Sequence, residues 1–224
     1  MLSIMETSVD NQTLEDMSLI ITHRMQSILS GIEGFAELLG DLVAGEEQRE
    51  LVRRILEGTA RLEYILQDLR FFSRPVQPLR LAVPVNELLI QLRMLLSEAQ
   101  EYRLDVQCEE EQTFIRVDPR LFAQALMAVL QNAFEAHKAE EPVQLRVYKK
   151  GDAIYFDSWN RGYIQVPFAE ERIFQPFFTT KAHNLGLGLA IARRIVRAHE
   201  GEIVLAQNHP EQGIIVRIQL PVSV

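Results

Sequence analysis

The stretch that decides the fold is RIFQPFFTTK (residues 172–181), followed five residues after its lysine by GLGLAIARRIVRAHEG (186–201). Apolar residues recur at helical spacing in the second segment, so we expect a helix there that Gly201 closes. Gly186 and Gly188 open this helix, and a helix N-terminus offers backbone N–H groups and a favourable dipole to phosphate oxygens. The segment predicts a phosphate-binding loop, although a GxG before a helix is weak evidence by itself.

The flanking sequence mixes helical and strand patterns and predicts an α+β domain over residues 76–224. Helices should cover one face of a largely antiparallel sheet. The expected elements are a linker and strand over 76–84, a helix over 85–102, a strand pair over 104–118, a helix over 121–137 that begins after Asp118-Pro119, a hairpin over 143–159 and two strands over 202–221.

Residues 1–75 have a different, purely helical pattern and form a separate domain, with the boundary near residues 73–79. Apolar residues repeat at every seventh position in the first helix: Leu14, Ile21, Ile28, Phe35 and Leu42. A second stripe runs to Phe72, where Ser73-Arg74-Pro75 ends the helix. A hairpin of two such helices leaves apolar surface exposed, so we expect a homodimeric four-helix bundle. The alternative is that the stripe packs on the chain's own second domain.

The composition of the chain excludes several classes of function. The chain has 224 residues, 47% of them hydrophobic, and a net charge of −8, which disfavours binding to nucleic acid or anionic lipid. The one cysteine, Cys108, allows no intramolecular disulfide and is expected to be a bystander. No apolar run is long enough to insert into a membrane, and the N-terminus does not read as a signal peptide. We therefore expect a cytoplasmic protein.

Four motifs carry a family resemblance: THRMQSILSGIEGFAELLG (22–40), LQNAFEAH (130–137), DSWNRGYI (157–164) and the stretch over 172–201 that contains RIFQPFFTTK and GLGLAIA. In this order they resemble the catalytic core of bacterial two-component sensor histidine kinases. Such a core joins a dimerisation and histidine-phosphotransfer hairpin to an ATP-binding domain of the kind shared with gyrase and Hsp90. The resemblance covers residues 10 to 222 and implies ATP and Mg²⁺ as cofactors.

The resemblance makes His23 the phosphoacceptor. The heptad count places it on the solvent side of its helix, where a neutral imidazole is available as a nucleophile. Most family members have a glutamate base next to the histidine, but Arg24 stands here and cannot accept a proton. Arg24 or Lys181 would help to neutralise charge on the transferred phosphoryl group. Ser27, one turn on, matches the position where relatives hold water for dephosphorylating the partner.

The resemblance also makes Asn132 the ligand of Mg²⁺, a cation that prefers oxygen donors. A buried amide at a helix end is the alternative reading. Related ATPases carry a water-activating glutamate four residues earlier, where this chain has Ala128. Transfer to a side chain is therefore favoured over plain hydrolysis of ATP.

The remaining cofactor-binding residues form two groups. In the first glycine box Gly162 is kept, while Asn160 replaces the adenine-binding aspartate and Ile164 replaces a glycine, which would strain a left-handed backbone and reduce ATP affinity. Asp157 lies nearby as a possible substitute or as a strand-end residue. The lid and second glycine box comprise Phe177, Phe178, Thr179, Thr180, Lys181, Gly186, Leu187 and Gly188. The alternative is that Phe177 and Phe178 are ordinary residues of the hydrophobic core.

The leading hypothesis is an ATP-dependent protein-histidine kinase that phosphorylates His23 and passes the phosphoryl group to an aspartate of a response regulator. The signal would arrive through a separate sensor protein, unless the chain is a fragment. Whether transfer occurs within or between protomers stays open. The runner-up is a histidine phosphotransferase or scaffold with an eroded nucleotide site, and a serine kinase of the anti-sigma type is disfavoured by the long hairpin.

Overall fold

The computed structural model describes residues 25–43, 45–72, 75–137, 141–181 and 185–222. Contacts divide the chain into two compact units, Met1–Pro75 and Val76–Val224. Among the described residues, no helix combines the length and the apolar character needed to cross a membrane.

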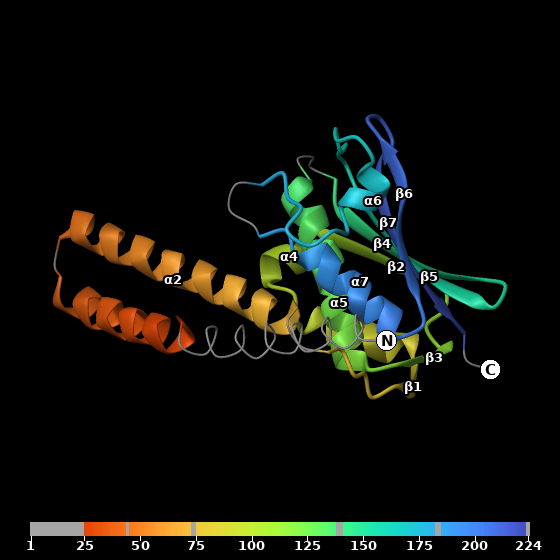
Figure 1. The fold of residues 1–224 in the computed structure, drawn as a ribbon, viewed down its shortest axis with the longest axis horizontal. Helices are drawn as coiled ribbons and strands as arrows, with labels where there is room; N and C mark the ends of the chain where they lie inside the picture. Colours follow the sequence, from red (N-terminus) through yellow and green to blue (C-terminus); the bar gives the residue numbers. More distant parts are fainter. Residues whose placement is uncertain (1–24, 44, 73–74, 138–140, 182–184, 223–224) are drawn as a thin grey trace, which may run out of the picture. The chain divides into compact units, whose positions relative to one another are not determined.

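The first unit contains a helix over residues 25–42 and the long helix α2 (Glu46–Phe72) (Figure 1). Its buried residues repeat at heptad spacing, Leu29 with Ala36 on the first helix and Val52 with Leu66 on α2. These positions form the seam inside the hairpin.

The apolar stripe of the first helix lies outside this seam. Ile28, Phe35 and Leu42 are 63%, 76% and 82% exposed, one helix position before the buried seam. Pairing two helices buries one stripe on each, and the neighbouring stripe stays outside. The described part of the hairpin therefore carries a second, exposed apolar face, as a bundle of more than two helices requires.

The second unit is built on a five-stranded sheet in the order β2-β4-β5-β7-β6. The strands are β2 (Leu104–Cys108), β4 (Val143–Lys150), β5 (Ala153–Asn160), β6 (Glu202–His209) and β7 (Gly213–Pro221). β2 pairs parallel with β4, and the other pairings are antiparallel. A separate ribbon pairs β1 (Leu81–Pro84) with β3 (Phe114–Val117).

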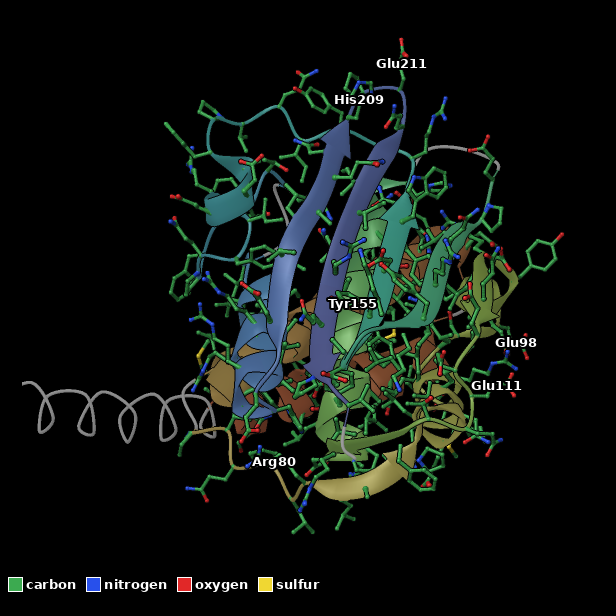
Figure 2. All side chains as sticks on the ribbon, turned by 90° about the vertical axis from the view of Figure 1, so that its right-hand side faces the viewer. Arg80, Glu98, Glu111, Tyr155, His209 and Glu211 are labelled. Carbon is green, nitrogen blue, oxygen red and sulfur yellow. The ribbon has the colours of Figure 1, made fainter. Side chains whose placement is uncertain are left out.

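Helices cover one face of this sheet, and Figure 2 shows the strands in front of them. The helices are α3 (Val85–Arg93), α4 (Glu98–Tyr102), α5 (Pro119–Ala136), α6 (Ala169–Arg172) and α7 (Gly188–Ala198). α5 packs against both α3 and α7. Phe122 of α5, Phe156 of β5 and Ile195 of α7 are at most 1% exposed, so the core lies between this helical layer and the sheet. The α+β prediction is confirmed.

Two details of the prediction are wrong. Residues 104–118 do not form a strand pair, because β2 joins β4 while β3 joins β1. Residues 85–102 form two helices, because Ser97 begins a new one with a capping box. Gly201 closes α7 through its N–H, and the left-handed residue is the one before it.

That residue is Glu200, with φ of 62°, and the Gly201 N–H donates to the Val196 carbonyl at 2.9 Å in a Schellman arrangement. Gly201 is needed for another reason, since a Cβ there would stand 2.6 Å from the Gln219 carbonyl oxygen. The Glu200 carboxylate meets Arg80 at 2.5 Å, and this contact lowers its pKa.

The solvent face of the sheet is held by a polar cluster around Tyr155, which Figure 2 shows in the middle of that face. Asp157 is 9% exposed and accepts two hydrogen bonds of 2.7 Å from Arg217. Tyr148 donates to the same carboxylate at 3.2 Å and stacks on Tyr155. The ion pair holds the pKa of Arg217 well above its ordinary value.

Candidate functional site

α5 carries Asn132 and has a well-defined start. Asp118 caps the helix by accepting the Leu121 N–H at 3.1 Å, and Pro119 occupies the first helical position. Behind the cap, His199 is 2% exposed and accepts the Asp118 N–H at Nε2 at 2.9 Å. The proton is therefore on Nδ1, which donates to the Ile195 carbonyl at 2.7 Å. Burial lowers the pKa of His199.

Asn132 and Lys181, which lie 49 residues apart in sequence, meet in the structure. The Lys181 ammonium donates to Asn132 Oδ1 at 3.1 Å and to Glu135 Oε2 at 2.7 Å. This contact joins the FFTTK segment to α5. Asn132 is half-buried on the last turns of the helix, with its side-chain oxygen turned toward the lysine.

The predicted phosphate loop depends on Gly186 for its conformation. Gly186 has φ of 68°, and a Cβ there would stand 2.6 Å from the Phe178 carbonyl carbon and closer still to its oxygen. Gly188 is different, since it begins α7 and a Cβ there would meet nothing within 4 Å. Leu187, the residue before the helix, is 1% exposed and anchors the turn in the core. The N-terminus of α7 thus presents open backbone at Gly188.

Residues 177–181 form the predicted lid segment, and their side chains differ in exposure and contacts. Phe177 has φ of 64° and is 59% exposed, so the plain-core reading of this residue is wrong. Phe178 lies under the Arg172 guanidinium, 4.6 Å from ring to cation. Thr179 Oγ1 accepts the Lys181 N–H at 3.0 Å, and Thr180 is exposed.

The first glycine box follows β5 and is held from two sides. Ile164 lacks the positive φ that would strain it, and its N–H and carbonyl pair with the Asn208 side chain at 2.9 and 3.0 Å. The expected strain at Ile164 is therefore absent. Asn160 is 3% exposed, and a Cβ at Gly162 would stand 3.1 Å from Asn160 Nδ2. Gly162 allows the loop to fold closely over this amide.

His137 ties this loop to the end of α5. It is 6% exposed, and its Nδ1 accepts the Arg161 N–H at 3.0 Å. The Nε2 proton is then donated to the Glu141 carbonyl. The helix that carries Asn132 and the loop that carries Asn160 are thus connected through one neutral imidazole.

Asp157 is not a substitute for Asn160. It lies inside β5 rather than at its end, three residues from Asn160, so the two side chains point to opposite faces of the sheet. Its carboxylate is engaged by Arg217 on the solvent face.

Two predicted catalytic residues, His23 and Arg24, lie outside the described residues. Ser27 lies on the helix over 25–42 and is exposed. The structure therefore joins Lys181 to Asn132 and packs Gly186 against the backbone of Phe178, while the phosphoacceptor assignment stays a prediction.

The Asn132 side-chain oxygen fits Mg²⁺. It is a neutral amide oxygen, a hard donor of the kind this ion prefers. Within the described ranges, no group of three or more His, Cys, Asp or Glu side chains is placed to bind a metal. An ion here would need oxygens from the nucleotide as well, as Mg²⁺ in nucleotide sites generally does.

Two models of protein families match this chain. Residues 13–78 match the model of the His Kinase A (phospho-acceptor) domain. Residues 117–224 match the model of the histidine kinase-, DNA gyrase B- and HSP90-like ATPases. The chain belongs to the two-component histidine kinases. The resemblance stated from the motifs is confirmed.

Individual relatives of this histidine kinase core are distant. The signal transduction histidine-protein kinase AtoS of Escherichia coli (strain K12) is 28% identical over 215 residues. The alignment covers 94% of this chain and 35% of AtoS, so the chain spans about a third of that protein.

Two solved structures share the fold. Full-length ShkA in complex with AMPPNP gives a TM-score of 0.75 at 23% identity, covering 93% of this chain and 46% of ShkA. Histidine kinase ThkA in complex with response regulator protein TrrA gives 0.66 at 24% identity, covering 93% of this chain and 61% of that one.

Sequence reasoning missed three residues that the structure adds to the candidate site. Glu135 lies three residues after Asn132, a spacing that places both on one helix face, and this signal was available in LQNAFEAH. His137 ends the same motif. Asn208 had no local signal, because its partner Ile164 lies 44 residues away.

Proposed function

We propose that the chain is the catalytic core of an ATP-dependent protein-histidine kinase acting in the cytoplasm. An imidazole nitrogen of His23 attacks the terminal phosphorus of ATP, the P–O bond to ADP breaks, and the imidazole proton leaves to solvent or to a base. The phosphoryl group then passes to an aspartate of a response regulator. ThkA, a relative in fold, has been solved with such a regulator, which supports this partner.

The observation that carries the proposal is the contact of Lys181 with Asn132 at 3.1 Å. It joins the lid segment to the amide on α5, and Gly186 packs against the Phe178 backbone of the same segment. Asn132 would hold Mg²⁺, which would neutralise phosphate charge, while Lys181 and the N–H groups at the start of α7 bind phosphate oxygens. Asn160 and Gly162 would border the adenine.

Ala128 supports phosphoryl transfer over hydrolysis. It lies one turn before Asn132 on α5, and its methyl group cannot activate water. The site therefore provides cation binding and positioning without its own carboxylate base at this place.

We also propose that the kinase is a homodimer. The exposed apolar stripe at Ile28, Phe35 and Leu42 is the surface that a second hairpin would cover. Ser27 would serve dephosphorylation of the regulator.

Incubation with γ-labelled ATP and Mg²⁺ tests the kinase. Wild type should acquire acid-labile label, and His23→Gln and Asn132→Ala should not. Label acquired only from a phosphorylated donor would favour the phosphotransferase instead. Acid-stable label would indicate a serine kinase.

A further inference from the structure

The Lys181 ammonium contacts two oxygens of α5. It lies 3.1 Å from Asn132 Oδ1 and 2.7 Å from Glu135 Oε2, and the Lys181 and Glu135 side chains are 31% and 30% exposed. The ion pair is therefore partly shielded from water. It fixes the lysine on the oxygen assigned to Mg²⁺.

Glu135 is itself held in place. Its second oxygen, Oε1, accepts a hydrogen bond of 2.9 Å from Gln131, one turn earlier on α5. Gln131 Oε1 in turn accepts 2.7 Å from Gln100 of α4. These bonds turn Oε2 toward the lysine, so the position of Lys181 is determined by α4 and α5 as well as by its own loop.

Lys181 and Mg²⁺ would compete for Asn132 Oδ1. Mg²⁺ binds oxygen ligands at about 2.1 Å. An ammonium 3.1 Å from the same Oδ1 would then be within about 5 Å of the divalent ion, and the two cations repel each other. Phosphate oxygens offer the lysine another set of acceptors. Entry of the Mg²⁺ nucleotide therefore requires Lys181 to leave Glu135.

We propose that Glu135 is a positioning residue of the nucleotide site. It holds Lys181 on Asn132 before nucleotide binds and releases it to the phosphates as Mg²⁺ takes the amide oxygen. This inference rests on the proposed function, because it assumes that the site binds Mg²⁺ and ATP.

The direction of the effect follows from the ion pair. A contact that exists only before binding opposes binding, so Glu135→Gln should tighten the affinity for Mg²⁺ and AMPPNP. A partly exposed pair limits the gain to at most about five-fold. In a protein that also carries Lys181→Met, the same Glu135→Gln change should leave the affinity unaltered, since no ammonium remains to be released.

Calorimetric titration of AMPPNP with Mg²⁺ into the four proteins of this cycle tests the idea. Glu109→Gln is the matched control, because it removes an exposed ion pair of 2.8 Å with Arg146 and should change no affinity. Tightening by Glu135→Gln that requires Lys181 supports the proposal. The proposal is overturned if Glu135→Gln leaves binding unchanged or weakens it in the protein that keeps Lys181. It is also overturned if Glu135→Gln has the same effect with Lys181 and with Lys181→Met.

Failure of the proposed function would look different. If wild type binds no AMPPNP with Mg²⁺, the nucleotide site and this inference fall together. If wild type binds and the cycle shows no coupling, the inference alone fails and the kinase proposal stands. Unfolding without ligand gives a second readout, in which Glu135→Gln should destabilise the Lys181 background more than the Lys181→Met background.

Discussion

Replacing Gly186 by alanine should damage both the stability and the nucleotide site. At φ of 68° an alanine costs about 1–2 kcal/mol. Its Cβ would also stand 2.6 Å from the Phe178 carbonyl carbon, and moving that backbone costs about another 1–2 kcal/mol. The sum, about 2–4 kcal/mol, corresponds to a fall in Tm of roughly 5–15 °C for a chain of this size.

Gly188→Ala is the matched control. Nothing lies within 4 Å of its Cβ, and at the start of α7 an alanine should leave the Tm unchanged or raise it slightly. The new methyl group would nevertheless stand where phosphate approaches the helix N-terminus, so calorimetry should show weaker binding of AMPPNP with Mg²⁺.

Thermal unfolding and calorimetry on both variants separate the two effects. A wild-type Tm for Gly186→Ala would refute the argument from backbone conformation. Wild-type affinity in Gly188→Ala would refute the assignment of α7 as the phosphate site.

Three further changes test the framework of the second unit. Asp157→Ala should lower the free energy of unfolding by about 1–3 kcal/mol in urea, because it leaves the half-buried Arg217 guanidinium without its two hydrogen bonds; an unchanged midpoint would contradict this. Asp118→Ala removes the cap of α5 and should cost about 1–2 kcal/mol, read from the same titration, whereas Asp118→Asn should retain much of it. Burial lowers the pKa of His199, so at acidic pH the unfolded chain binds a proton at this residue more readily than the folded chain does. Wild type should therefore lose stability as the pH falls below about 6.5, the ordinary pKa of histidine. His199→Gln should lose less stability between pH 7 and 5, as measured by unfolding across that range.

The sequence determined the local elements of this protein. Asp118 and Pro119 start α5 where the pattern placed them, because capping depends on residues within one turn. The motifs with Asn132 and Gly186 identified the family, because each combines several residue types at fixed short spacing.

Only the tertiary structure decided which distant groups meet. β2 pairs with β4 instead of β3, Lys181 contacts Asn132 and Glu135, and Asn208 bonds the backbone of Ile164, which lacks the positive φ expected there. The side-chain contacts join residues 44 to 49 positions apart in the sequence, and all of these pairings depend on packing around the core between α5, α7 and the sheet. Periodicity and capping act over a few residues, so they specify each helix and strand but not the partner that lies across the fold.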